Sequence, residues 1–467
     1  MGLVLAALAS LALASPAWPL RSSATARYLE DQVGQPFLIT SDTAWCLVNG
    51  LTDQQIDTYL DKRQAQGFNA VQFMLMPKHD FCAVGGTSVD PYGHSPFVTG
   101  DQDWSTPDEA FWSRVDRILG KLEARGMLAL VTPAYLGLGC YYGTQGWCTD
   151  MAAQPVANMT SFGAFLGNRY RSRGNIIWIA GGDADPRVYT GIDDRVNALM
   201  SAITQAEAGR HLITGHASRG ITGFEAFGAH AWLTLDSAYD GDTCPDDTMA
   251  TQIETEVDRT PALPVFSIEQ RFDAEGADGP CLADQYLWAA LGGGVGHSYG
   301  NAYTWTFLPG WDTDSGIDSS NVPFQTNSAR LVRSRRFWLF VPDEQHQSVV
   351  AGYGSGSSTV VTGRASNGET IMAYVPDGGT TITVDLNRLS GARATGYWYD
   401  PETGQATSLG VFGTSGLMDF VSPGDARVLV LDDASRGLPV PGSRDAAFRG
   451  TRPSRRTPRF LRDEIPR

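Results

Sequence analysis

Two carboxylates, Asp183 and Glu269, each come directly after a short run of apolar residues. Asp183 ends the stretch 175–183, NIIWIAGGD, in which five apolar residues are followed by two glycines. Glu269 ends a similar run at 264–268, PVFSI. Runs this short and this apolar are typical of strands that are covered on both faces, as in parallel sheets. We therefore expect both carboxylates at the C-terminal ends of parallel strands, where the loops of such folds converge on one crevice.

A pair of carboxylates at such a crevice could divide the work of an acid and a nucleophile. Cleavage of an acetal needs a carboxylic acid that protonates the leaving oxygen and a carboxylate that attacks the anomeric carbon, about 5 to 5.5 Å apart for retention. In this scheme Asp183 is the acid/base, kept protonated by desolvation or by its neighbour's charge, and Glu269 is the ionised nucleophile. Two alternatives stay open: Asp183 could merely cap the next turn, and Asp185 competes with it for the acid role.

The rest of the chain supplies the elements that must position these residues. We expect eight strands, at 37–40, 69–76, 128–132, 176–180, 211–214, 231–235, 264–268 and 294–300. Helical patterns alternate with them, at 52–67, 107–126, 161–170, 193–206 and 249–257, with a closing helix at 328–340. This alternation is the pattern of an α/β fold of the (β/α)8 TIM barrel type. A doubly wound open sheet is the rival, but no Gly-x-Gly-x-x-Gly follows the first strand.

The starts of two helices carry clear signals. Thr52 and Gln55 have the spacing of a capping box, and Gly67 ends the helix that follows. Pro107 is expected at the first helical position of the next helix, which Gly126 ends.

The C-terminal part of the chain reads differently. Short β-rich runs separated by turns predict a small antiparallel β-sandwich domain at 346–433, after a catalytic barrel at 27–341. The tail 434–467 carries nine Arg against three acidic residues, with many Pro and Gly, so we expect it to be disordered. Attachment to a surface is a second interpretation of its charge.

Further polar and aromatic side chains fall at the predicted strand ends. Carboxylates, imidazoles and aromatics at this face could bind a sugar, since Trp and Tyr stack on sugar rings. The candidates for substrate binding are Asp42, Trp45, Gln72, Tyr135, His216, His297, Tyr299 and Trp305. Asp236 and Asp240 are weaker candidates than Asp185 for the acid role. Most of them could instead be structural: a hydrogen-bonding role is the alternative for Asp42 and the two His, and a core position for the two Trp. No His-x-x-x-His or comparable cluster indicates a metal site, and no cofactor is expected.

Composition and cysteine usage narrow the partners and the compartment. A formal charge of -16 argues against nucleic acid as a partner. Residues 1–17 are read as a signal peptide, although no Lys or Arg precedes the apolar core; a membrane anchor or a buried first helix is the alternative. After its removal we expect a secreted protein without membrane contact. Six cysteines fit export, with Cys140–Cys148 and Cys244–Cys281 as suggested pairs among fifteen connectivities.

At this point the sequence resembles a known family. The segments are SDTAW at 41–45, QGFN at 66–69, NIIW at 175–178 with GGD at 181–183, IE at 268–269, and GHSYG at 296–300 with Trp305. They resemble the apiosidase-like glycoside hydrolases, glycoside hydrolase family 140, over about Arg27 to Val341. The β-rich module resembles the C-terminal domain that accompanies them and is labelled collagen-binding, for which a packed accessory sandwich is the plainer interpretation.

The resemblance implies a retaining barrel enzyme whose Asp acid/base and Glu nucleophile correspond to Asp183 and Glu269. Two departures bear on which sugar is recognised. The family text near the nucleophile is closer to Glu-Pro-x-Tyr-Glu than to the Glu-Gln-Arg-Phe-Asp of 269–273, and His216 is followed by Ala217 rather than Pro.

The sequence thus predicts a secreted retaining glycoside hydrolase that is exo-acting on polysaccharide side chains and takes a carbohydrate as its partner. An endo-glycanase on the same barrel is one alternative, which the loops 77–100 and 137–151 would decide. A non-catalytic carbohydrate-binding or adhesion protein is the other. The sequence leaves the oligomeric state open.

Overall fold

The computed structural model describes residues 15–82, 85, 87–140, 144–240, 244 and 247–443. The predicted signal peptide therefore lies almost wholly outside the described residues, as does the tail beyond residue 443. Residues 434–443, which we expected in the disordered tail, are packed: the guanidinium of Arg335 donates to the Pro439 carbonyl at 3.0 Å, and Gly442 N–H donates to Ser334 Oγ at 3.1 Å.

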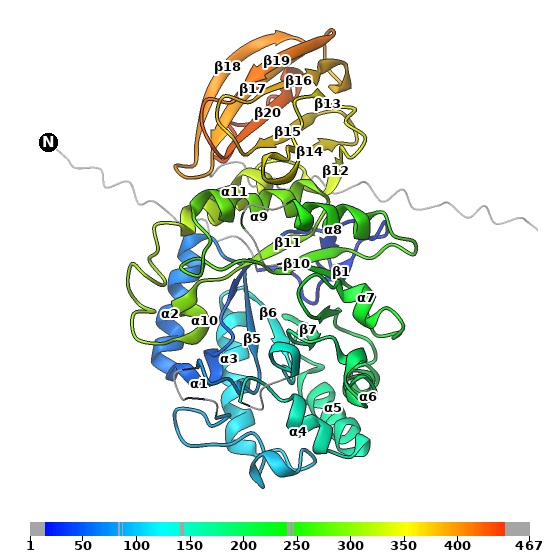
Figure 1. The fold of residues 1–467 in the computed structure, drawn as a ribbon, viewed down its shortest axis with the longest axis vertical. Helices are drawn as coiled ribbons and strands as arrows, with labels where there is room; N and C mark the ends of the chain where they lie inside the picture. The colour runs from blue at the N-terminus through cyan, green and yellow to red at the C-terminus, as the bar shows by residue number, and fades with distance from the viewer. Residues whose placement is uncertain are drawn as a thin grey trace, which may run out of the picture.

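Eight parallel strands form the barrel that the sequence predicts (Figure 1). The sheet order is β8-β7-β6-β5-β4-β11-β10-β9. The gap between β8 and β9, the two ends of this order, is bridged near the starts of the strands. There the N–H groups of Thr234 and Leu235 both donate to the Ile213 carbonyl at 3.0 Å. The strands are β4 (Ile39–Thr43), β5 (Ala70–Met74), β6 (Leu128–Thr132), β7 (Ile176–Gly181), β8 (Ile213–His216), β9 (Asp236–Tyr239), β10 (Val265–Glu269) and β11 (Gly296–Tyr299).

Helices cover the outside of this barrel. The longer ones are α2 (Asp53–Gln66), α3 (Glu109–Ala124), α5 (Val156–Tyr170), α6 (Ile192–Ala206), α8 (Thr248–Val257), α9 (Gly279–Leu291) and α11 (Val322–Arg333). Shorter ones are α1 (Leu47–Gly50), α4 (Cys148–Ala153), α7 (Gly223–Phe227) and α10 (Ala302–Thr306). In the described part of the chain, no helix is both long and apolar enough to cross a membrane.

The predicted capping box of α2 is confirmed. Thr52 and Gln55 bond each other's backbone N–H groups, and Gly67 closes the helix with φ of 105°. For α3 the prediction is wrong by a short distance: Asp108 is the N-cap, accepting from Ala110 N–H, while Pro107 lies before the helix and pairs with Phe97.

Two further element predictions need correction. The sixth barrel strand is not 231–235 but β9, because the apolar run is a turn that packs Trp232 and Leu233 inward before the strand begins. The closing helix is α11 rather than 328–340, and Phe340 already belongs to the first strand of the C-terminal domain.

A small hairpin sheet closes the N-terminal end of the barrel. Its strands are β1 (Arg21–Ser22), β2 (Leu29–Glu30) and β3 (Pro36–Phe37). Leu20 and Leu29 belong to the same buried cluster as the side chains that fill the barrel interior, among them Ile39, Leu130 and Ile268. The interior is therefore a packed core, and a substrate can approach only from the C-terminal end.

The C-terminal domain is the predicted antiparallel β-sandwich. Its two sheets have the orders β12-β14-β15-β20-β17-β18 and β13-β16-β19 and enclose a core of their own. The strands are β12 (Phe340–Pro342), β13 (Val349–Ala351), β14 (Val361–Ala365), β15 (Thr370–Val375), β16 (Thr381–Asp385), β17 (Arg393–Asp400), β18 (Gln405–Gly413), β19 (Leu417–Val421) and β20 (Arg427–Asp433).

The sandwich sits on the outer face of the barrel at α9 and α11 (Figure 1). α9 is buried along almost its whole length, because it has the barrel wall on one side and β14 and β15 on the other. A buried ion pair joins Arg335 to Asp432 at 2.6 Å, and Tyr374 Oη donates to the Asp284 carboxylate. Buried side chains of the two domains therefore also pack together in one apolar cluster at their interface.

Candidate active site

Asp183 stands just beyond the end of β7, after two glycines with positive φ. Gly181 and Gly182 have φ of 80° and 130°, and Asp183 itself has φ of 53°. A Cβ on Gly182 would lie 2.3 Å from Tyr135 Cδ2. The glycine pair thus lets the chain turn tightly against the Tyr135 ring, and it leaves the Asp183 side chain 9% exposed at the mouth of the barrel.

Glu269 reaches the same place from β10 through an irregularity in the sheet. The pairing of β10 with β9 shifts register between Ser267 and Glu269, so that Glu269 lies opposite Tyr239. A bulge of this kind re-aims a side chain. Glu269 is 9% exposed, and its Oε2 lies 3.4 Å from His216 Nε2.

Tyr239 contacts Asp183 and lies opposite Glu269 in the sheet. Its hydroxyl donates to Asp183 Oδ1 at 3.2 Å and accepts from Arg219 Nε at 3.0 Å. Burial, and then the charges of Glu269 and Asp183, raise the pKa of Tyr239 well above 10, so the phenol keeps its proton. Sequence reasoning missed both residues. Tyr239 would have been found with β9 in its correct position, whereas no sequence signal marks Arg219 in the loop after β8.

Aromatic rings line the site around the carboxylates. The Trp45 and His216 rings are stacked with centroids 5.6 Å apart, Tyr135 is 5.2 Å from Trp45, and Tyr239 is 4.8 Å from His216. Burial, and next the charge of Arg219, lower the pKa of His216 to about 3, so this imidazole is neutral. Among the described residues, neither ring nitrogen of His216 nor Glu269 Oε2 has a hydrogen-bond partner. These buried polar atoms are available to a ligand.

The electrostatics of the pair favour one shared proton. Burial and then the charge of Asp183 raise the pKa of Glu269 well above its usual range, while Arg219 and a hydrogen bond from the Trp45 side chain lower it. Two carboxylates in one desolvated site do not both ionise readily. The arrangement has the groups for proton transfer and nucleophilic attack at one carbon.

A comparison with models of protein families shows to which family the chain belongs. The family model described as "Apiosidase-like, catalytic domain" matches residues 23–319. The chain belongs to the apiosidase-like family. Residues 341–432 of this apiosidase-like chain match a second model, described as "Putative collagen-binding domain of a collagenase". Both matches agree with the resemblance noted in the sequence.

Solved structures share the fold of the apiosidase-like chain. One, titled a glycoside hydrolase, has a TM-score of 0.75 and 21% identity, covering 90% of this chain and 97% of that one. A family 5 glycoside hydrolase from Bacteroides vulgatus has a TM-score of 0.73 and 21% identity, covering 89% of this chain and 94% of that one. No curated protein matches the sequence. With the family established, the chain is a glycoside hydrolase whose class of substrate is carbohydrate.

Three predicted substrate-binding residues lie outside the site of this apiosidase-like barrel. Asp42 is fully buried on the outward face of β4, where it accepts from Arg63 Nε at 2.6 Å and from Tyr59 on α2. Tyr299 donates to Asp273 at 2.7 Å. His297 Nδ1 is 2.9 Å from Ser267 Oγ, and its ring meets Tyr286 of α9 edge-on. Asp42 and His297 thus make structural contacts, and those of Asp42 are chiefly with the Arg63 and Tyr59 side chains and not with the strand-end backbone donors that we weighed.

The remaining predicted residues face the barrel opening or its interior. Trp45, Tyr135 and His216 surround the carboxylates, and Gln72 is buried in the interior with no hydrogen-bond partner for its amide among the described residues. Trp305 lies at the rim and donates from Nε1 to Glu275 at 2.7 Å. Asp236 is at the start of β9 and accepts from Phe224 N–H at 2.6 Å, so it is away from the opening.

Asp185, the rival acid, is committed to another contact. It caps a short helical turn and pairs with Arg187 at 2.6 Å, which together hold its pKa low. Elsewhere in the described residues, no group of three or more His, Cys, Asp or Glu is arranged to hold a metal ion. The cysteines form Cys46–Cys82, Cys140–Cys148 and Cys244–Cys281, which include both suggested pairs and fit an extracellular protein.

Proposed function

We propose that the protein is a retaining glycoside hydrolase in which Asp183 is the acid/base and Glu269 the nucleophile. The observation that carries this proposal is the meeting of the two carboxylates, from the fourth and seventh barrel strands, in one buried aromatic site. Tyr239 touches Asp183 directly, and its raised pKa responds to both charges. His216 contacts Glu269 on the other side.

The reaction would proceed in two displacements. Asp183 gives its proton to the leaving oxygen while Glu269 Oε attacks the anomeric carbon, which forms a glycosyl-enzyme and releases the leaving alcohol. Asp183, now ionised, takes a proton from water, and that water attacks the anomeric carbon and restores Glu269. The proton that the pair shares must start on Asp183. The Trp45 hydrogen bond and Arg219 lower the pKa of Glu269 and so act against burial and the charge of Asp183, which raise it.

Neutral His216 suits the site because it adds no charge beside the nucleophile. Its pKa of about 3 keeps it uncharged over the working range of a glycosidase, so it can bond a sugar hydroxyl or Glu269 as donor or acceptor. The stacked Trp45 ring fixes the plane of the imidazole.

We further propose exo action on a polysaccharide side chain, with an apiose-like sugar as the first candidate, and secretion of the enzyme. The family supports the sugar class. Two disulfides, Cys46–Cys82 and Cys140–Cys148, hold the loops after β5 and β6 beside the opening, as a closed pocket for a terminal sugar requires. An open cleft between these loops would instead suit an endo-glycanase.

The test is product release from pectic and arabinan-type polysaccharides by wild type, Glu269→Gln and Asp183→Asn. We expect one substrate to yield a monosaccharide and both variants to lose activity by a factor on the order of 10³ or more. Asp185→Asn, which changes a neighbouring carboxylate, serves as the matched control and should retain most of the activity. Release of oligosaccharides would favour the endo-glycanase, and binding without release would favour a carbohydrate-binding protein.

A further inference from the structure

Three aromatic rings gather at the rim of the opening, outside the carboxylate site. Phe81 and His79, in the loop after β5, have centroids 5.1 Å apart and an interplanar angle of 31°. Both rings meet the Trp305 ring of α10 edge-on, with centroid distances of 6.1 Å for Phe81 and 5.3 Å for His79. Phe81 is 54% exposed. We call Phe81, His79 and Trp305 the aromatic platform.

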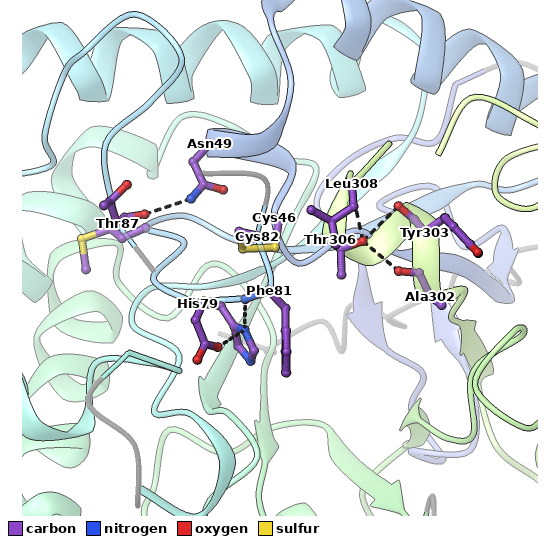
Figure 2. The surroundings of a disulfide bond; sticks show 12 residues. Cys46, Asn49, His79, Phe81, Cys82, Thr87, Ala302, Tyr303, Thr306 and Leu308 are labelled. Carbon is purple, nitrogen blue, oxygen red and sulfur yellow. Dashed lines mark hydrogen bonds and ion pairs between the residues drawn. A yellow bond between two sulfur atoms is a disulfide. The ribbon is translucent and has the colours of Figure 1, made fainter. Parts of the chain in front are cut away.

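The platform is held in place by covalent and hydrogen bonds. The disulfide Cys46–Cys82 ties the residue after Phe81 to the turn that follows β4, and Figure 2 shows Phe81 and His79 projecting from the loop beside it. Phe81 N–H donates to His79 Nδ1 at 3.1 Å, and Cys46 N–H donates to the Trp305 carbonyl at 3.0 Å. Burial lowers the pKa of His79, so its ring is neutral and Nδ1 can accept. A surface fixed in this way binds with little loss of conformational entropy.

Two neighbouring residues link the platform to the carboxylate site. Trp45, which stacks on His216, immediately precedes the disulfide-bonded Cys46. On the other side, the Trp305 indole N–H bonds Glu275, a residue whose charge contributes to the raised pKa of Glu269. A ligand that is held between Asp183 and Glu269 and extends toward Trp45 and Glu275 is therefore directed to the side on which the platform lies.

An exposed Phe ring that lies beside two further rings offers a contiguous apolar surface to a ligand. The C–H faces of a sugar ring provide such a surface, and the Glu275 carboxylate beside Trp305 can accept from a hydroxyl at the edge of the same ring. A charged ligand fits less well, because the platform itself is neutral and its nearest charge is negative.

We propose that the aromatic platform is a subsite for a second sugar ring of the substrate, the ring joined to the one held at the carboxylates. This inference rests on the proposed glycosidase function and adds to it. It makes the enzyme selective for a saccharide of at least two rings over a single glycosyl group with a small leaving group.

The first experiment measures binding with Glu269→Gln protein, which leaves the glycan intact. Migration in native gels that contain pectin or arabinan gives a dissociation constant. Adding Phe81→Ala should weaken binding about fivefold to tenfold, the effect of exposing a stacked ring face. Phe81→Trp should restore it. Leu417→Ala, at a 63% exposed apolar residue on the sandwich, is the matched control and should migrate as the parent does.

The second experiment compares hydrolysis of the polysaccharide with that of the glycosyl fluoride of the released sugar. Phe81→Ala should lower kcat/KM on the polysaccharide about fivefold more than on the fluoride. Equal losses, or unchanged migration of Phe81→Ala, would overturn the platform while a Glu269-dependent reaction still stood. If wild type hydrolyses nothing, the catalytic proposal fails, and weaker binding by Phe81→Ala would still support the platform. If neither the pectin gel nor the arabinan gel slows the migration of the Glu269→Gln parent, the proposal of the platform is also refuted.

Discussion

At the scale of single residues, the site depends on contacts between neutral and charged partners. Tyr239 keeps its proton beside two carboxylates, and Arg219 supplies a positive charge from an exposed loop. His216 is neutral because it is buried. The two carboxylates that we propose as catalytic therefore share one proton beside an imidazole and a phenol that both stay neutral between about pH 4 and pH 9.

Tyr239→Phe tests the hydrogen bond that Tyr239 donates to Asp183. The variant removes the hydroxyl that donates to Asp183, so the ionised form of Asp183 is less stable and its pKa rises. We expect kcat/KM to fall about tenfold to a hundredfold, and the alkaline limb of the pH profile, which follows deprotonation of the acid, to move to higher pH. The measurement is kcat/KM against pH.

Tyr299→Phe is the matched control for this variant. It also deletes a buried hydroxyl, but that hydroxyl bonds Asp273 behind the barrel wall. It should lower stability and leave the pH profile in place. If Tyr239→Phe gave the same profile as Tyr299→Phe, the hydrogen bond from Tyr239 to Asp183 would have no part in setting the proton balance.

At the scale of elements, the alternation of side chains along each strand decides which residues enter the site. Ile39 faces the barrel interior, so Asp42 on the same strand faces α2. The rule that functional residues lie at strand ends could not show which way Asp42 points. It considers how far along the strand a residue lies, and not to which face of the sheet its side chain alternates. The bulge before Glu269 has the opposite effect and brings a carboxylate to the opening. Sequence cannot reveal such a local shift in register.

The strands and helices themselves were largely predictable from sequence. Short apolar runs identified β6, β7 and β10 because buried parallel strands need such runs. β9 was misplaced because its sequence, DSAY, is polar: Ser237 bonds the Gly215 carbonyl and Tyr239 serves the site. A strand that contributes a side chain to the site thus carries a weak hydrophobic signal.

Gly182→Ala tests how β7 delivers Asp183. The new Cβ would overlap the Tyr135 ring at 2.3 Å, at a φ of 130° that L residues rarely adopt. We expect a loss of about 1–3 kcal/mol in the free energy of unfolding and a fall in kcat of at least about a hundredfold, because Asp183 moves. Urea unfolding and steady-state kinetics measure the two effects.

Gly209→Ala is the matched control for the backbone effect. Gly209 also has a positive φ, 65°, but nothing lies within 4 Å of its added Cβ. It should cost stability without lowering kcat. Full activity of a folded Gly182→Ala enzyme would show that Asp183 does not depend on this turn.

At the scale of the whole molecule, the barrel and the sandwich share α9 as a common buried layer. Asp284 lies in the middle of this helix, and burial raises its pKa to about 7 even though Tyr374 of the sandwich donates to it. The folded protein therefore holds a proton on Asp284 that the unfolded chain releases near pH 4. The free energy of unfolding should fall as the pH rises from about 4 to about 7 and then level off.

Asp284→Asn removes this titration and keeps an acceptor for Tyr374. The shift of about three pKa units corresponds to about 4 kcal/mol, so the variant should be more stable than wild type at pH 8 by up to that amount and nearly equal to it at pH 4. Urea unfolding at the two pH values measures this, with the exposed Asp312→Asn as control. A variant less stable than wild type at pH 8 would mean that the ionised carboxylate stabilises the interface.

Azide rescue of Glu269→Ala and Asp183→Ala on an activated glycoside tests the proposed roles of the two carboxylates most directly. Azide should restore turnover of both variants. Glu269→Ala should yield a glycosyl azide with the anomeric configuration inverted relative to the substrate, because azide replaces the nucleophile. Asp183→Ala should yield the azide with retained configuration, because azide then attacks the glycosyl-enzyme on Glu269. The reverse assignment of products, or no azide product from either variant, would contradict the roles given to Asp183 and Glu269.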